Sequence, residues 1–145
     1  MIIPLFCISQ LRTMSFKDWE IKQAEEPKPT VIHIYTDWCS ICRIEQFELN
    51  KDRQLLELIN EKFYFIPFEA EKMTETVRFQ EKIFRYLPNG NSGIHELALA
   101  LSKNKSRPVY PLWIILNENQ NLVDYHEGIF LPEQLEKKLV EILNF

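Results

Sequence analysis

Short apolar runs alternate with polar segments along the chain and predict the strands of a β-sheet. The segment 30–35 is β-branched and aromatic, and the segment 63–68 is apolar almost throughout. A strand that is apolar on both faces is typical of the middle of a sheet, so we expect a central position for 63–68. The run 112–116 is followed by the polar segment 117–121 and by 122–125, which together predict a β-hairpin.

Helical patterns separate these runs. Ser15, with Asp18 three residues later, forms a capping-box pattern that predicts a helix start. The segment 42–49 carries Ile44 and Phe47 with charged residues between them, which predicts an amphipathic helix.

Two further helices are predicted on either side of the chain's least regular part. One covers 55–59, and the other begins at Pro132, which suits the first position of a helix. The apolar residues of the last helix keep a spacing of three and four: Leu135, Leu139, Ile142 and Leu143.

The least regular part is the segment 71–107. The stretches 76–80 and 83–86 alternate apolar and polar residues, which favours a small hairpin or an extended arm. The segment 89–93 is a turn cluster, and 94–101 predicts a helix. The predicted order is therefore α, β, α, α, β, an inserted segment, α, β, β, α.

Composition limits the classes to which the protein can belong. The chain has 145 residues, which is enough for one domain. Its content of 46% hydrophobic and 12% aromatic residues indicates a globular protein. A formal charge of −4 without a cluster of basic residues argues against a nucleic-acid partner. No apolar run approaches the roughly 20 residues that span a bilayer, so we expect no stable membrane span.

The run 37–42, with the sequence DWCSIC, places Cys39 and Cys42 between a predicted strand and a predicted helix. Unpaired backbone amides at a helix start carry a partial positive charge that favours a thiolate on the first cysteine. A thiolate is the species that attacks disulfides, so the spacing predicts a redox centre.

Two other uses of the cysteine pair are weaker. A structural zinc site needs four ligands, and the remaining candidates do not have ligand spacing to the pair: Cys7, His33, His95 and His126. A purely structural disulfide would close too small a loop to stabilise the fold much. We therefore expect no metal and no organic cofactor, and we interpret His95 and His126 as surface or packing residues.

The N-terminal residues 1–13 resemble the remnant of a secretion signal. A short apolar stretch is followed by polar residues, and the small residues Cys7 and Ser9 precede a possible cleavage point before Gln10. A lipid anchor on Cys7 is disfavoured because the bulky Phe6 precedes it. The pattern predicts a periplasmic or secreted protein, and the alternative is an apolar N-terminus of a cytoplasmic one.

The element order, the W-C-x-x-C motif and the Tyr110-Pro111 step before a hairpin resemble the thioredoxin superfamily over residues 14–145. The similarity is greatest to secreted bacterial thioredoxin-like proteins that carry an insert before the proline, here at about 72–107. The resemblance implies an α/β fold with a mixed central β-sheet flanked by helices on both faces.

The resemblance also implies roles for individual residues. Cys39 would be the nucleophile, and Cys42 would resolve the mixed disulfide. Pro111 would be cis and lie against the redox pair, while the backbone at Tyr110 would pair with an extended substrate. Trp38 would pack beside the cysteines, shielding them and lining a substrate groove, or serve the structure alone.

Three departures from the family pattern concern the dipeptide and the proton-handling residues. The dipeptide Ser40-Ile41 is neither the Gly-Pro of thioredoxins nor the His-containing pair of oxidants. His33 stands where thioredoxins have a buried acid, and Pro67 falls at about the place of its partner lysine. His33 either accepts the proton of Cys42 or is a core histidine with a satisfied hydrogen bond.

These observations predict a thiol–disulfide oxidoreductase that exchanges electrons between the Cys39–Cys42 pair and protein disulfides. We expect a monomeric reductase that acts on protein thiols and disulfides and is recharged by a redox partner. The alternative function is a thioredoxin-fold module that binds peptides or proteins with little redox turnover.

Overall fold

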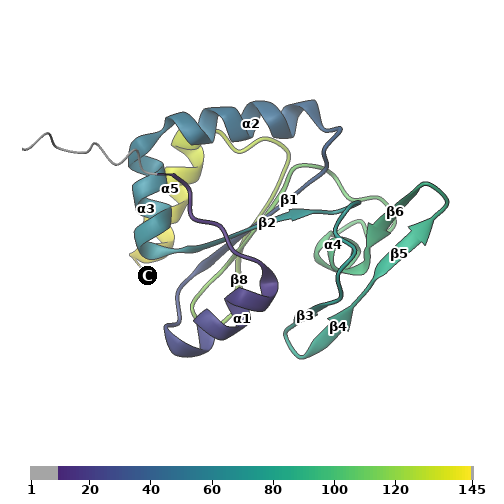
Figure 1. Ribbon diagram of the computed structural model, residues 1–145. Helices are drawn as coiled ribbons and strands as arrows, with labels where there is room; N and C mark the ends of the chain where they lie inside the picture. The colour runs from purple at the N-terminus through teal and green to yellow at the C-terminus, as the bar shows by residue number, and fades with distance from the viewer. Residues whose placement is uncertain (1–9, 145) are drawn as a thin grey trace, which may run out of the picture.

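A computed structural model describes residues 10–144, and Figure 1 shows the arrangement of its elements. The helices are α1 (Phe16–Glu25), α2 (Ser40–Lys51), α3 (Arg53–Lys62), α4 (Glu96–Leu101) and α5 (Pro132–Leu143). The strands are β1 (Thr30–Tyr35), β2 (Tyr64–Glu69), β3 (Val77–Phe79), β4 (Lys82–Phe84), β5 (Tyr86–Asn89), β6 (Ser92–His95), β7 (Leu112–Leu116) and β8 (Leu122–Glu127). The apolar stretch that includes Cys7 lies outside the described residues.

The helix ends follow the local chemistry of the sequence. The Ser15 hydroxyl accepts a hydrogen bond from the Asp18 amide at 3.1 Å and begins α1, as the capping-box pattern predicts. The Asp52 carboxylate accepts from the Leu55 amide at 3.0 Å, which separates α3 from α2. Pro132 occupies the first turn of α5, where its missing amide proton costs no hydrogen bond.

The central sheet has four strands in the order β2-β1-β7-β8. β1 and β2 run parallel, while β1–β7 and β7–β8 are antiparallel, so the sheet is mixed. The predicted hairpin of β7 and β8 is confirmed.

The expectation of a central position for 63–68 is wrong, because β2 forms one edge of the sheet. Its apolar sequence has a different cause: both of its faces are covered, with Phe65 in one core and Phe68 in the other. The chain just before α1 also runs along this edge, where the Met14 amide donates to the Phe65 carbonyl at 3.1 Å.

Helices cover both faces of the sheet (Figure 1). One core contains residues of α2, α3 and α5 packed against Val31 and Trp113 of the sheet. The other contains residues of α1, β3 and α4 packed against Ile32 and Ile114. Alternate residues of β1 and β7 therefore enter opposite cores, as the two-residue period of a strand requires.

The segment 72–107 forms two small hairpins, β3–β4 and β5–β6, followed by the short helix α4. The expected hairpin at 76–86 is present. The helix expected from Ile94 begins only at Glu96, because Ile94 pairs with Leu87 in a β-ladder and His95 caps the helix. Whether this segment is an insert relative to similar proteins stays a prediction.

The residues on the buried face of α2 are not the ones that its sequence pattern predicts. Ile44 and Phe47 are 56% and 63% exposed, whereas Cys42, Glu45 and Leu49 are buried. The prediction assumed that the apolar residues of an amphipathic helix face the core. In α2 the carboxylate of Glu45 occupies a core position instead. Among residues 10–144, no helix is long and apolar enough to cross a membrane.

Candidate redox site

The two cysteines form a disulfide at the start of α2. Cys39 is the N-cap of the helix, and its Sγ accepts a hydrogen bond from the Cys42 amide at 3.2 Å. Cys39 is 7% exposed and Cys42 is 1% exposed. Cys39 is therefore the more exposed residue of the two, and it lies at the helix start, where backbone amides are unpaired.

Trp38 directly precedes Cys39 in the chain, and Tyr110 lies next to Trp38. Their rings meet edge to face with centroids 6.1 Å apart, and the Trp38 indole donates to Glu71 Oε2 at 2.6 Å. The Tyr110–Pro111 peptide bond is cis. Trp38 is 65% exposed, so its ring is open to a partner.

The backbone of Tyr110 lies outside the sheet ladders. The β1–β7 register ends at Leu112, opposite Ile34, and the β7–β8 register ends at the same residue, opposite Glu127. Pro111 still takes part in the fold, because its carbonyl accepts from the Gly128 amide at 2.8 Å. Tyr110 therefore stands at the end of β7, next to Trp38 and before the first paired residue.

The surface next to Trp38 is electronegative. Burial raises the pKa of the Tyr110 phenol to about 12, and the carboxylates of Glu71 and Glu69 add to this shift. Burial also raises the pKa of Glu69, with further contributions from Asp37 and Glu71 that a hydrogen bond from the Glu71 amide partly offsets. Lys72 is the cation of this cluster and pairs with Asp37.

His33 is buried, and its partner is Glu45 of α2. The His33 Nε2 and Glu45 Oε1 atoms are 2.8 Å apart, and both residues are 1% exposed. The second oxygen, Glu45 Oε2, accepts from the Trp113 indole at 2.9 Å and from the Phe130 amide at 2.6 Å. One buried carboxylate thus joins α2 to β1, β7 and the loop before α5.

Sequence reasoning singled out His33 but missed Glu45. One signal was available: Cys42, Glu45 and Leu49 have the spacing of three and four that defines one face of a helix. With Cys42 placed inside, that spacing puts Glu45 inside as well. Pro67 is opposite His33 in the β1–β2 register, as the comparison with the family pattern suggested.

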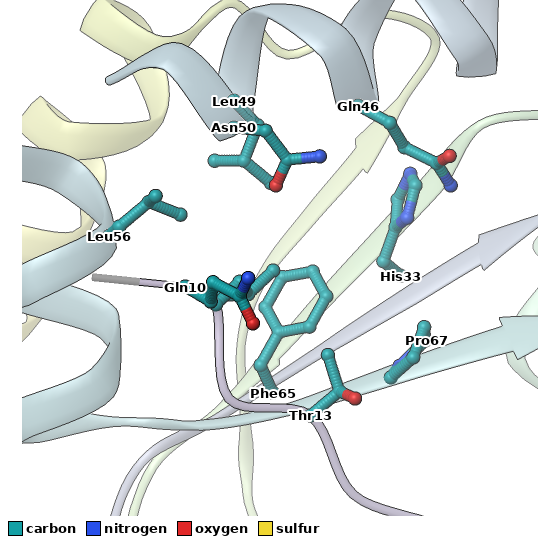
Figure 2. A pocket seen from close by; sticks show the side chains of 10 residues that line it. Gln10, Thr13, His33, Gln46, Leu49, Asn50, Leu56, Phe65 and Pro67 are labelled. Atoms are coloured by element: carbon teal, nitrogen blue, oxygen red, sulfur yellow. The ribbon is translucent and has the colours of Figure 1, made fainter. Parts of the chain in front are cut away.

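A cavity of about 470 Å³ lies between α2, β1, β2 and the segment before α1. Figure 2 shows His33 and Gln46 on one side of this cavity and Leu56 on the other, with Phe65 between them. The buried His33 ring thus lines a space that polar side chains such as Gln46 and Gln10 also line.

The other two histidines have partners of their own. His95 is fully buried at the start of α4, where it caps the helix. The His126 ring stacks on Phe130 with centroids 4.1 Å apart. Within residues 10–144, no group of three or more His, Cys, Asp or Glu side chains is placed to hold a metal ion. Cys7, the third cysteine, lies outside that range.

No protein-family model matches this chain, and no curated protein matches it. Solved structures do match. Chloroplastic thioredoxin z has a TM-score of 0.57 at 15% identity, over 100% of this chain and 99% of that one. A thioredoxin from Thermus thermophilus has a TM-score of 0.61 at 15% identity, over 92% of this chain and 88% of that one.

A third structure, described as DsbH oxidoreductase, has a TM-score of 0.63 at 9% identity, over 100% of this chain and 92% of that one. At these identities the similarity concerns the fold. The chain has the thioredoxin fold, with a mixed central sheet flanked by helices on both faces, and the fold-class prediction is confirmed.

Proposed function

We propose that this protein is a thiol–disulfide oxidoreductase that exchanges electrons between the Cys39–Cys42 pair and protein disulfides. The observation that carries the proposal is the disulfide itself, formed across the first turn of α2 with its more exposed cysteine at the N-cap. A cysteine in this position can attack, and a neighbour three residues on can resolve.

In the proposed reaction the Cys39 thiolate attacks one sulfur of a substrate disulfide and releases the other sulfur as a thiolate. Cys42 then loses its proton, attacks Cys39 and releases the second substrate thiolate. Two electrons pass to the substrate, and the Cys39–Cys42 disulfide forms. A redox partner must then reduce the pair before another cycle.

The residues beside the pair support substrate binding. Trp38 is 65% exposed, and the backbone of Tyr110 lies beyond the sheet ladders, so both are available to an extended segment of a substrate protein. In this role Tyr110 and Pro111 form one wall of the substrate site, and Trp38 forms the other.

We propose the reductase direction because a carboxylate lies near the pair. Glu71 accepts a hydrogen bond from the indole of Trp38, the residue before Cys39. The carboxylate of Asp37 is paired with Lys72. Negative charge disfavours a thiolate, and the strongest oxidants of this fold owe their potential to a stabilised reduced form. We therefore expect a potential nearer to −270 mV than to −120 mV.

The test is equilibration of the protein with glutathione or dithiothreitol, followed by alkylation and mass spectrometry of Cys39 and Cys42. A potential of about −270 mV supports a reductase, and a potential of about −120 mV means a disulfide donor. A pair that never forms a disulfide excludes both directions.

A second candidate function is a protein-binding module with little turnover. The observation that favours it is a row of exposed apolar side chains on the outer face of α2, formed by Ile41, Ile44 and Phe47. The variant Cys42→Ser separates the two functions. An oxidoreductase accumulates mixed disulfides on Cys39, whereas a binding module retains the same partners without a covalent bond.

We propose a periplasmic or secreted location on the strength of the apolar stretch in residues 1–13. In that compartment a dedicated electron donor would recharge the pair. Expression of the full chain with a C-terminal tag, followed by fractionation and N-terminal sequencing, tests the location against the cytoplasmic alternative. An intact N-terminus in the cytoplasmic fraction would contradict it.

A further inference from the structure

The loop 103–107, which follows α4 and which we call the basic loop, is positively charged in an otherwise acidic protein. It carries Lys103, Lys105 and Arg107 and no acidic residue, whereas the whole chain has a formal charge of −4. Every residue of the basic loop is exposed. Among residues 10–144, no carboxylate forms an ion pair with any of its three cations. Their charge is therefore available to a partner.

Hydrogen bonds hold the basic loop in a defined shape. The side-chain oxygen of Asn104 accepts from the amide and the hydroxyl of Ser106 at 3.3 and 2.9 Å. The carbonyl of Asn104 accepts from the Arg107 amide at 3.2 Å and from the Ser102 hydroxyl at 3.0 Å. A loop that is ordered before binding loses less conformational entropy when a partner binds.

Tyr125 of β8 anchors the first residue of the basic loop. The Lys103 amide donates to the Tyr125 hydroxyl at 2.9 Å, and the Lys103 ammonium lies 4.4 Å from the centroid of the same ring. The Tyr125 hydroxyl donates to Glu127 Oε1 at 2.7 Å, so this carboxylate offsets part of the charge of Lys103. Lys105 and Arg107 are the cations that the anchor does not use.

The basic loop lies at the same end of the sheet as the redox pair. The pair follows β1, and Leu112, the first residue of β7, is opposite Ile34 near the end of β1. Leu112 is also opposite Glu127, the last residue of β8. Arg107 is three residues before Tyr110, so their Cα atoms are at most about 11 Å apart.

Charges of opposite sign lie on the two sides of this end of the sheet. In the strand order β2-β1-β7-β8, Glu69 ends β2 and Glu71 follows it, while the basic loop is attached to β8. Neighbouring strands are about 4.8 Å apart, so β2 and β8 are about 14 Å apart. Tyr110 precedes β7, between the two groups. An acidic side chain of a partner is therefore repelled on the β2 side and attracted on the β8 side.

We propose that the basic loop is a docking surface for acidic side chains that flank the disulfide of a substrate protein. The inference rests on the proposed function and specifies the chemistry of its substrates. The acidic flank lies on the β8 side, toward Lys105 and Arg107, while the disulfide meets Cys39. Such charge complementarity steers the encounter and fixes the orientation of the partner. Three cations make a smaller basic surface than nucleic-acid binding requires, so a protein partner fits the loop better.

The test compares three substrates of the reduced full chain with Cys7→Ser. They are symmetric disulfides of one short peptide in which both residues flanking the cysteine are glutamate, glutamine or lysine. The reaction is stopped by acid at set times, and mass spectrometry measures the fraction of protein with the Cys39–Cys42 disulfide. The measured quantity is the rate for the glutamate peptide divided by the rate for the glutamine peptide, because this ratio cancels effects on the exchange step itself.

The principal variant reverses two charges of the basic loop, with Lys105→Glu and Arg107→Glu together. The Arg107 contact that shapes the loop uses its backbone amide, which the substitution keeps. The matched control, Lys22→Glu with Lys62→Glu, reverses two exposed charges at the opposite end of the sheet, where β2 begins at Tyr64. The Tyr64 hydroxyl donates to the Lys22 carbonyl at 3.4 Å, which places Lys22 at that end. A milder variant is Lys105→Gln with Arg107→Gln.

We expect the charge reversal to lower the glutamate-to-glutamine ratio about tenfold at about 0.01 M salt. The effect should shrink to less than about twofold at about 1 M salt, because the screening length falls from about 30 Å to about 3 Å. The lysine-to-glutamine ratio should rise in the same variant. The milder variant should lower the first ratio about threefold, and the control should leave it within about twofold of the parent.

An unchanged ratio in the reversed loop at low salt would overturn the proposal. An equal fall in the control would also overturn it, because the effect would then come from net charge. If the reversed loop does not fold, by circular dichroism, the milder variant decides. A parent protein that reduces none of the three peptides would overturn the proposed function and this inference with it. A parent that reduces all three, with ratios that the loop does not change, would overturn the docking surface alone.

Discussion

Two histidines are fully buried in this protein, and their surroundings give them different chemistry. His33 faces a carboxylate, Glu45, at 2.8 Å. The ring nitrogens of His95 bond only to backbone groups: Nε2 donates to the Glu75 carbonyl at 2.8 Å, and Nδ1 accepts from the Leu97 amide at 3.1 Å. A carbonyl only accepts and an amide only donates, so His95 is locked in one neutral form.

The difference teaches that the partners of a buried histidine decide whether its site includes a charge. The carboxylate of Glu45 gives His33 a charged partner in the core, whereas the ring nitrogens of His95 have only neutral partners. Protonation of His95 would turn an acceptor of the helix cap into a donor. Burial lowers the pKa of His95, which keeps it neutral and structural.

The largest effect on stability is expected from removal of the Glu45 carboxylate. The variant Glu45→Ala leaves His33 with no carboxylate and removes the acceptor of Trp113 and Phe130. Loss of a buried, hydrogen-bonded charge should lower the free energy of unfolding by about 3–5 kcal/mol. Urea unfolding measures it, with the exposed Glu48→Ala expected to cost under about 0.5 kcal/mol. A loss below about 1 kcal/mol at Glu45 would contradict the buried network.

A smaller loss is expected at the second histidine. The variant His95→Ala removes a helix cap and a ring packed edge to face on Phe68 with centroids 5.1 Å apart. The cost should be about 2–3 kcal/mol of unfolding free energy, in the range of a lost cap and a partly filled cavity.

A fall in pH should reduce the stability that His95 contributes, without any substitution. The unfolded chain binds a proton at His95 near pH 6.5, while the folded protein binds it only at lower pH because burial lowers the pKa. The stability from His95 is therefore complete above pH 6.5 and is lost as the pH falls toward the folded value.

We expect the contribution of His95 to the free energy of unfolding to fall between pH 7 and 5, because the unfolded chain binds the proton first. Urea unfolding at each pH measures the drop, and it should be smaller in His95→Gln. An identical pH dependence in the variant would assign the effect to other groups.

The smallest effect is expected on the outer face of α2, opposite Glu45. Ile44 and Phe47 are exposed, so Ile44→Ser and Phe47→Ser should change the free energy of unfolding by less than about 0.5 kcal/mol. Urea unfolding tests this as well. A loss above about 1.5 kcal/mol from either variant would mean that this face packs against something in the folded protein.

Much of the fold was predictable because its signals are local. The cap at Ser15, the proline that opens α5 and the polar turn between β7 and β8 depend on neighbours within a few residues. The candidate site was predictable for the same reason at Cys39 and Cys42, because the C-x-x-C spacing is a local sequence signal of a redox pair.

The position of β2 and the inner face of α2 were not predictable from such signals. Apolar content does not distinguish a central strand from an edge strand that is covered on both faces, as β2 is. The periodicity of α2 favoured Ile44 and Phe47 as its packed residues. A carboxylate is ordinarily too costly to bury, so Glu45 was passed over.

The sequence by itself determined the strand–helix order, the redox pair at a helix start and the absence of an acid at position 33. Only the tertiary structure decided which face of α2 is inside. Glu45 can be buried because three donors from distant parts of the chain, His33, Trp113 and the Phe130 amide, converge on it. These partners are 12, 68 and 85 residues from Glu45 in the sequence, so no local pattern around Glu45 indicates them. A buried carboxylate is stabilised by the groups near it in space, which only the tertiary structure brings together.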